Sequence, residues 1–246
     1  MNRLLLLRHA VTGHTGARLS GWLPGIQLSE QGLVQARALA ERLAAVPIDA
    51  VYSSPLERCL ETARVVAEPR GLKVTTVDDL GEVHYGDWTG KELKELAKLD
   101  LWRLVQRHPS GVRFPGGESL YELQARAVLA VEALRAEQDA TAGADGKPRT
   151  VAVFSHADVI KALVAHYLGM HLDLYQRLAV SPASLTAVGF TPTPVLLRLN
   201  DTGDHSDLVA KDPKGQGDRE DREGREGSGE PGRGAPEDRE GMRAQP

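Results

Sequence analysis

Short apolar runs alternate along the chain with longer segments in which apolar residues recur every three or four positions. The short runs predict β-strands, at residues 4–7, 49–53, 73–77, 150–154, 185–190 and 195–199. The periodic segments predict helices, at residues 30–45, 55–68, 120–137 and 159–168. This alternation is typical of an α/β protein. We therefore predict a three-layer sandwich, with a mostly parallel central sheet and helices on both faces.

The segment between Gly90 and Phe114 is more polar than its neighbours and predicts only a short helix. Its apolar positions are expected to face inward, namely Leu93, Leu96, Leu101 and Leu104. So short a segment forms only a small cover over any site beside it.

Composition narrows the class of protein. The chain has 246 residues with a formal net charge of -4, and no segment is a basic stripe, so we expect no nucleic-acid partner. Its apolar runs are far shorter than the roughly 20 residues that span a bilayer, so we expect no membrane segment. The leucines near the N-terminus are too few for a signal peptide, and Cys59 is the single cysteine, so we expect a cytoplasmic protein without disulfides.

From about Lys211 the sequence becomes rich in glycine, proline and charged residues of both signs. Such a composition cannot bury enough apolar surface to fold. We therefore predict a catalytic domain over residues 1–209 and a disordered tail over residues 210–246.

Charged and polar residues follow several of the predicted strands. Arg8 and His9 come directly after residues 4–7, and His156 follows residues 150–154. Arg58 lies in the first turn of the helix that follows the second strand, where free backbone N–H groups favour an anion. Because ligands of such sheets bind at the carboxyl ends of the strands, we expect these four side chains to surround an anionic substrate. Taken alone, Arg58 is explained equally well as a surface residue paired with a neighbouring glutamate.

A glycine-rich loop over residues 81–90 supplies a carboxyl group for proton transfer. Two arginines and two histidines would stabilise a phosphoryl group, and the leaving oxygen then needs a proton. Glu82 is the first candidate for this acid, with Asp87 and Asp158 as rivals. We also expect His14 to line the mouth of the pocket. Trp22 and Trp88 either wall the pocket or pack against the sheet.

At this point the sequence resembles the histidine phosphatase superfamily, the group of phosphoglycerate mutases and many small-molecule phosphatases. The resemblance covers most of residues 3–168 and rests on segments in the family's order: LLLLRHAVT, SGWLPGIQLSEQGLVQARALAERL, VYSSPLERCLETA, GEVHYGDWTG, FPGGES and VAVFSHADVIKAL. Residues 170–204 look most similar to a branch whose members are named phosphomutases. The resemblance implies a phosphoglycerate mutase-like fold.

The resemblance also implies roles for individual residues. His9 would be the nucleophile that forms a phosphohistidine, and Glu82 the acid and base. The groups that would hold the phosphoryl oxygens are Arg8, Arg58, His156, Thr15 and Ala157. We further expect a backbone carbonyl to bind the second ring nitrogen of His9 and so fix its tautomer.

The chain departs from the family's usual sequence beside the nucleophile. Ala10 replaces a glycine, which matters if the backbone there needs a positive φ or a close approach to phosphate. Val11 replaces a common glutamate, Thr15 a frequent asparagine, and Ala157 and Asp158 a frequent pair of glycines. These changes weaken the case for a glycolytic mutase.

Three functions remain open at this stage. We predict a phosphatase that hydrolyses a small-molecule phosphomonoester through a phosphohistidine, without a metal or other cofactor. The alternatives are a phosphomutase, and a non-catalytic protein that binds a phosphorylated ligand. A cysteine phosphatase is disfavoured because Cys59 lies inside a predicted helix. A metal site is disfavoured because His156, His166 and His171 lack the spacing of metal ligands. The sequence specifies neither the substrate nor the oligomeric state.

Overall fold

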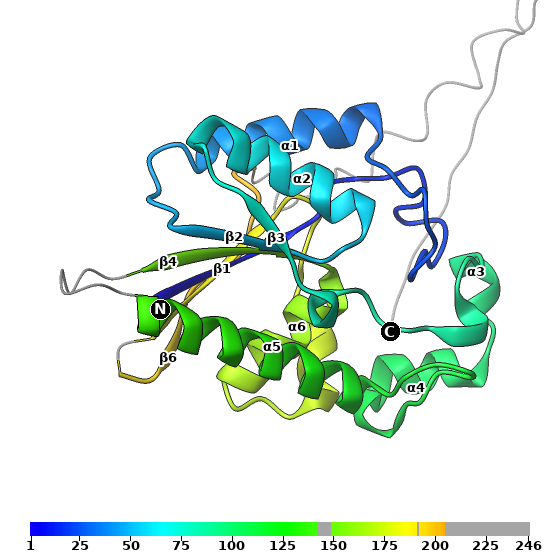
Figure 1. The fold of residues 1–246 in the computed structure, drawn as a ribbon. Coiled ribbons are helices and arrows are strands. Elements are labelled where there is room, and N and C mark those ends of the chain that lie inside the picture. The colour runs from blue at the N-terminus through cyan, green and yellow to red at the C-terminus, as the bar shows by residue number, and fades with distance from the viewer. Residues whose placement is uncertain (142–148, 191, 205–246) are drawn as a thin grey trace, which may run out of the picture. The chain divides into compact units, whose positions relative to one another are not determined.

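The computed structural model describes residues 1–141, 149–190 and 192–204, so the tail predicted over residues 210–246 lies outside the described part. The described residues contain a sheet of six strands in the order β3-β2-β4-β1-β5-β6 (Figure 1). The strands are β1 (Arg3–Arg8), β2 (Ala50–Ser53), β3 (Val74–Thr76), β4 (Thr150–Ser155), β5 (Leu185–Phe190) and β6 (Pro194–Asp201). β1 to β4 pair in parallel, whereas β5 is antiparallel to both β1 and β6.

Helices cover both faces of this sheet, as the alternating pattern predicts. On one face lie α1 (Glu30–Arg42) and α2 (Glu57–Ala67), and on the other α5 (Leu120–Thr141) and α6 (Ala157–Tyr167) (Figure 1). Two shorter helices, α3 (Leu93–Leu96) and α4 (Asp100–Arg107), lie between β3 and α5 in the sequence. None of the described helices is long and apolar enough to cross a membrane. The α/β sandwich is confirmed.

The position of β1 in the centre of the sheet explains why its sequence is uniformly apolar rather than alternating. Leu4 and Leu6 belong to the core cluster that includes buried residues of α5 and α6. Leu5 and Leu7 belong to the cluster under α1 and α2. All four side chains are buried because a strand covered on both faces has no solvated side.

Parallel pairing fixes where the charged residues lie. In the β1–β4 ladder Arg8 stands opposite Ser155, so His9 and His156 both follow at the same edge of the sheet. β2 pairs with the other side of β4, with Ser53 opposite Phe154, and delivers the start of α2 to that edge. The expected meeting of strand ends is confirmed.

Some local predictions are wrong. α2 begins at Glu57 rather than Pro55, because Leu56 keeps an extended backbone with φ -75° and ψ 137°. The segment between Gly90 and Phe114 forms two helices, and Leu104 is 38% exposed while Val105 is buried. Leucines spaced three or four apart share a face only within one continuous helix, and here the break after α3 changes the inward positions.

The first helix is fixed tightly to the loop that follows β1. The Ser29 hydroxyl caps α1 by accepting a hydrogen bond from the Gly32 amide (3.1 Å), and the Ser29 amide donates to the Val11 carbonyl (3.0 Å). A Cβ atom on Gly32 would overlap the backbone carbonyl of Val11. Gly32 therefore allows α1 to approach the chain two residues after His9.

We predict that Gly32→Ala lowers the free energy of unfolding by about 1–3 kcal/mol, because backbone must move to admit the methyl group. Chemical denaturation measures this change. Gly13→Ala is the matched control, since a Cβ there meets nothing within 4 Å. Equal stability of both variants and the native protein would contradict the proposed close approach.

Candidate active site

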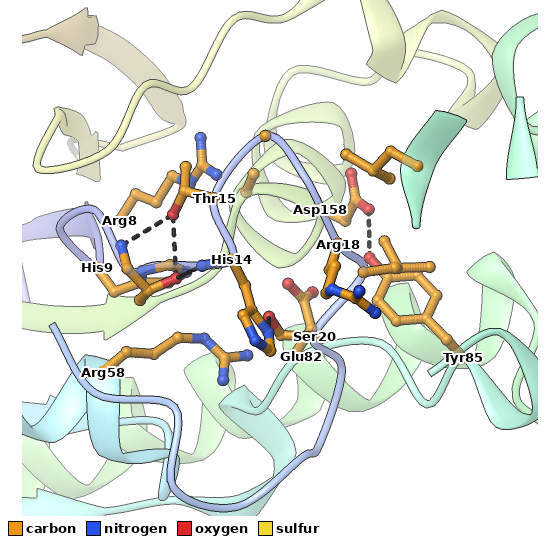
Figure 2. Close-up of a pocket in the computed structure, with 15 residues that line it drawn as sticks. Arg8, His9, His14, Thr15, Arg18, Ser20, Arg58, Glu82, Tyr85 and Asp158 are labelled. Carbon is orange, nitrogen blue, oxygen red and sulfur yellow. Dashed lines mark hydrogen bonds between the residues drawn. The ribbon is translucent and has the colours of Figure 1, made fainter. Parts of the chain in front are cut away.

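A pocket of about 170 Å³ lies at the carboxyl edge of the sheet (Figure 2). Most of the side chains that the sequence proposed line it: Arg8, His9, Thr15, Arg58, Glu82 and Ala157. His14 lines it too, as expected. The pocket therefore brings together residues from the first strand to the last long helix.

His9 is held as a neutral imidazole with one nitrogen available. Its Nδ1 lies 2.8 Å from the Ala10 carbonyl oxygen, which can only accept a hydrogen bond, so Nδ1 carries the proton and Nε2 keeps its lone pair. The pKa of His9 lies well below its usual value of 6.5, mainly because the ring is buried and further because Arg58 and Arg8 are positive. The expected orientation by a backbone carbonyl is present.

The two arginines donate hydrogen bonds to backbone carbonyls, and each keeps further N–H groups that could bind a ligand. Nη1 of Arg8 donates to the Val180 carbonyl (2.7 Å), and Nη2 of Arg58 donates to the Gly21 carbonyl (2.9 Å). Nε of Arg8 and Nη1 of Arg58 are buried and find no hydrogen-bond acceptor among the described residues. Buried N–H donors on cationic groups are costly without an acceptor, and oxygens of an anion are suitable acceptors. The interpretation of Arg58 as a surface residue is wrong, since its side chain is buried.

Glu82 has the protonation behaviour of a general acid. Burial raises its pKa to about 7, and the nearby charge of Asp158 adds to this rise. One carboxyl oxygen accepts the Val83 amide (3.0 Å), and the other lies 3.7 Å from Nδ1 of His156. Of the rival carboxylates, Asp158 lines the pocket and accepts the Tyr85 hydroxyl (2.9 Å), whereas Asp87 is not among the lining residues.

His156 occupies a different place from that of the other predicted residues. Its side chain is fully buried, its ring lies 5.2 Å from that of His9, and it is not part of the pocket lining. Nδ1 lies 3.3 Å from Nη2 of Arg58, whose N–H groups can only donate, and Nε2 lies 2.8 Å from the Ser54 hydroxyl. In this structure His156 contacts the guanidinium of Arg58, and through it supports the pocket.

Comparison with known families identifies the superfamily of this chain. A family model described as "Histidine phosphatase superfamily (branch 1)" matches residues 4–202, which include every site residue named above. The chain belongs to the histidine phosphatase superfamily.

Several relatives of this histidine phosphatase have names that describe an activity. Phosphoserine phosphatase 1 of Hydrogenobacter thermophilus is 32% identical over 206 residues, which cover 82% of this chain and 93% of that protein. Phosphoglycerate mutase-like protein 4 of Arabidopsis thaliana is 33% identical over 166 residues, covering 65% of this chain and 68% of that protein. The structure of a mycobacterial glucosyl-3-phosphoglycerate phosphatase with VO3 has a TM-score of 0.74 and 32% identity, covering 82% of this chain and all of that one (100%).

The superfamily and these relatives establish the kind of enzyme. The chain is a histidine phosphatase, which hydrolyses small-molecule phosphomonoesters through a phosphohistidine. The competing cysteine mechanism has no support, because burial raises the pKa of Cys59 to about 12 and leaves its thiol protonated.

The replacement of glycine by Ala10 causes no backbone strain. Among the described non-glycine residues, positive φ angles occur at Ala183 and Asn200 and not at Ala10. The Ala10 methyl group is packed in the core under α1 and α2, and the Ala10 amide donates to the Thr62 hydroxyl (3.1 Å). Thr15 also keeps a hydroxyl at the pocket, where it accepts the Thr12 amide (3.0 Å).

The structure adds pocket residues that the sequence did not single out, notably Arg18, Ser20 and Tyr85. Arg18 is paired with Glu92 (2.9 Å) and the Gly90 carbonyl (3.1 Å), so it reaches the pocket from an exposed loop. The sequence carries no local signal for this placement. Tyr85 lies inside the loop that supplies Glu82. A buried tyrosine hydroxyl usually has a polar partner, but the sequence does not show which residue that partner is.

The two tryptophans have different roles. Trp22 stacks on His84, with ring centroids 4.5 Å apart, and its Nε1 donates to the Glu82 carbonyl. Trp88 is buried beside Trp102 and Phe114. Trp22 therefore positions the loop that carries Glu82, while Trp88 packs among buried aromatic residues.

Arg126 on α5 holds the backbone that leads into Glu82. Its Nη1 donates to the carbonyls of Asp79 (2.7 Å) and Gly81 (2.9 Å), and its Nη2 to the Glu82 carbonyl (2.8 Å). The same guanidinium makes a two-pronged ion pair with Glu118, at 2.9 Å and 2.7 Å. Glu118 thus supports the loop of Glu82, while Ser119 forms a capping box through mutual hydrogen bonds with Glu122.

We predict that Arg126→Met lowers kcat by about tenfold to a hundredfold and changes KM less, because Glu82 loses its fixed position. Steady-state kinetics on an alkyl phosphate measures this split. Arg113→Met is the control, since Arg113 makes an ion pair at the surface with Glu122 (2.6 Å). An unchanged kcat in a folded Arg126→Met variant would show that the clamp does not position the acid.

Proposed function

We propose that His9 attacks the phosphorus of a small-molecule phosphomonoester in the pocket described above, and that water then releases the phosphate. The observation that carries this proposal is the neutral His9, with Nε2 free, beside Arg8 and Arg58, each of which has one buried nitrogen without an acceptor among the described residues. A phosphoryl dianion supplies both an electrophile for Nε2 and oxygens for those donors.

The first half of the reaction forms the phosphohistidine. Nε2 of His9 bonds to phosphorus as the ester P–O bond breaks, and Glu82 gives its proton to the leaving oxygen. Arg8 and Arg58 hold the equatorial oxygens and stabilise the negative charge. Thr15 and Ala157 border the phosphoryl group, and His156 keeps Arg58 in place.

The second half regenerates the enzyme. The Glu82 carboxylate takes a proton from a water molecule as that water attacks phosphorus on the other side of the P–N bond. The bond to Nε2 breaks, inorganic phosphate leaves, and Glu82 is again protonated. A pKa of about 7 suits both roles, since each form is populated near neutral pH.

Hydrolysis is favoured over transfer by the small cover of the pocket. α3 has four residues and α4 has eight, and a mutase must exclude water while a substrate hydroxyl accepts the phosphoryl group. The mutase-like name of one relative keeps phosphomutase as the second candidate. Phosphoserine and glucosyl-3-phosphoglycerate, named in the relatives, are the first substrates to test. A cytoplasmic location and the lack of a nucleic-acid partner stay predictions.

We predict release of inorganic phosphate from a panel of phosphorylated metabolites, with no isomerised phosphate ester. Phosphate assay and phosphorus NMR on the same reactions distinguish the two outcomes. His9→Ala should abolish turnover. Formation of an isomer would favour the mutase, and phosphate affinity in the native protein without any turnover would favour a binding protein.

We predict a pH dependence that separates the acid from the nucleophile. The relevant quantity is kcat/KM for an alkyl phosphate divided by that for 4-nitrophenyl phosphate, each corrected for the second ionisation of the ester itself, because the nitrophenolate leaves without a proton and both esters meet the same ionisations of the other enzyme groups. This ratio should fall by up to about tenfold per pH unit as the pH rises through 7 and Glu82 loses its proton. His9 is already neutral there, since its pKa is lowered well below 6.5.

Glu82→Gln is the control for this profile. An amide cannot give up a proton, so the ratio should be low and independent of pH in this variant. A ratio that stays constant from about pH 5.5 to 8.5 in the native enzyme would contradict the role of Glu82.

A further inference from the structure

A second cavity, of about 180 Å³, adjoins the active-site pocket. Leu19, Tyr85 and Asp158 line both, so the two spaces share one wall. Figure 2 shows Tyr85 and Asp158, joined by their hydrogen bond, on the opposite side of the pocket from Arg8 and His9. An ester whose phosphoryl group lies at His9 therefore extends its alcohol part toward this cavity.

Aromatic rings make up much of the cavity's lining. Trp88 lies 5.3 Å from Phe114 and 6.2 Å from Trp102, and Phe114 meets Tyr85 edge to face at 5.0 Å. Tyr85, Trp88 and Phe114 are buried, which fixes their rings in place. We call this space the aromatic cavity. Its walls offer faces and edges against which a flat ring can pack.

The size of the aromatic cavity suits one ring. An apolar cavity of about 150 Å³ in another protein holds one benzene molecule. The 180 Å³ observed here therefore accommodates a six-membered ring with one small substituent.

One edge of the aromatic cavity is polar. Lys161 on α6 donates to the Gln176 side chain (3.0 Å) and lies 3.7 Å from Asp158. The positive charge of Lys161 is thus balanced by Asp158, and a second carboxylate placed there would be repelled by Asp158. A neutral hydrogen-bond acceptor fits this edge better than an anion.

We propose that the aromatic cavity binds the alcohol part of the substrate, and that this part carries a planar six-membered ring with a neutral hydrogen-bond acceptor facing Lys161. This inference rests on the proposed function, because it takes the phosphoryl group to lie at His9. It names the substrate as a phosphomonoester of a ring-bearing alcohol.

The test is a series of phenylalkyl phosphates with linkers of one, two and three carbons, each compared with the alkyl phosphate of the same linker. The ratio of the two kcat/KM values is the aryl preference. We expect an aryl preference of about tenfold or more at one linker length, as burial of a ring supplies that much binding energy. A 4-acetyl group on that ring should raise kcat/KM further.

Three variants locate the effect within the cavity. Trp102→Ala should reduce the aryl preference by about tenfold, whereas Tyr121→Ala, which removes an aromatic residue 51% exposed on α5, should leave it unchanged. Lys161→Met should abolish the benefit of the 4-acetyl group, with the unsubstituted ester measured in the same variant as its reference.

The outcomes separate this inference from the proposed function. Hydrolysis of alkyl phosphates with an aryl preference near one at every linker would overturn the inference and leave the phosphatase intact. If no monoester is hydrolysed, the proposed function fails, and calorimetry with the matching phenylalkyl and alkyl phosphonates tests the cavity separately. Equal affinity of those phosphonates would then overturn the inference.

Discussion

Two arginines beside a neutral histidine, Arg58 buried and Arg8 half-buried, are the constraint on which the rest of this site depends. Backbone carbonyls of Val180 and Gly21 satisfy only part of their hydrogen-bonding capacity, and each guanidinium keeps one buried nitrogen without an acceptor among the described residues. Their charge, added to burial, keeps His9 unprotonated. This arrangement suits a dianion, because the anion balances the positive charge and supplies acceptors for the remaining N–H groups.

The two carboxyl groups of the pocket, those of Glu82 and Asp158, have different surroundings. Burial and Asp158 raise the pKa of Glu82, while Arg58 and Arg8 oppose this rise, and the balance lies near neutrality. Asp158 is bonded to Tyr85 and faces Lys161, so it stands at the boundary between the phosphoryl pocket and the aromatic cavity. In the proposed mechanism one carboxyl serves proton transfer, and in the proposed substrate site the other borders the space for the alcohol.

The sequence predicts those parts of the site that follow directly from strand ends. A uniformly apolar run that ends in Arg8 and His9 marks a buried parallel strand and places both residues at its carboxyl edge. Glu82 is a candidate for the acid because it lies in a glycine-rich loop beside the strand ends, and the resemblance to the family implies the same role. These features depend on local patterns and on one rule of sheet topology.

The remaining features depend on contacts between distant segments. The sequence predicts His156 at the phosphate, but its burial and its contact with Arg58 follow from the packing of β4 against α2, which no local pattern shows. Arg126 reaches the loop of Glu82 from 44 positions away in the sequence, and no motif marks it. The aromatic cavity is likewise assembled from six separate regions of the chain, so no periodicity reveals it.

The proposed mechanism requires that His9 becomes covalently phosphorylated on Nε2. Rapid acid-free quenching of the enzyme during turnover, followed by proton–phosphorus correlation NMR on the denatured protein, identifies the modified nitrogen. We expect one phosphohistidine, at His9, with phosphorus on Nε2, because Nδ1 donates to the Ala10 carbonyl. Phosphorus on Nδ1 or on another residue, or steady turnover without any phosphoenzyme under conditions where its breakdown limits the rate, would contradict it.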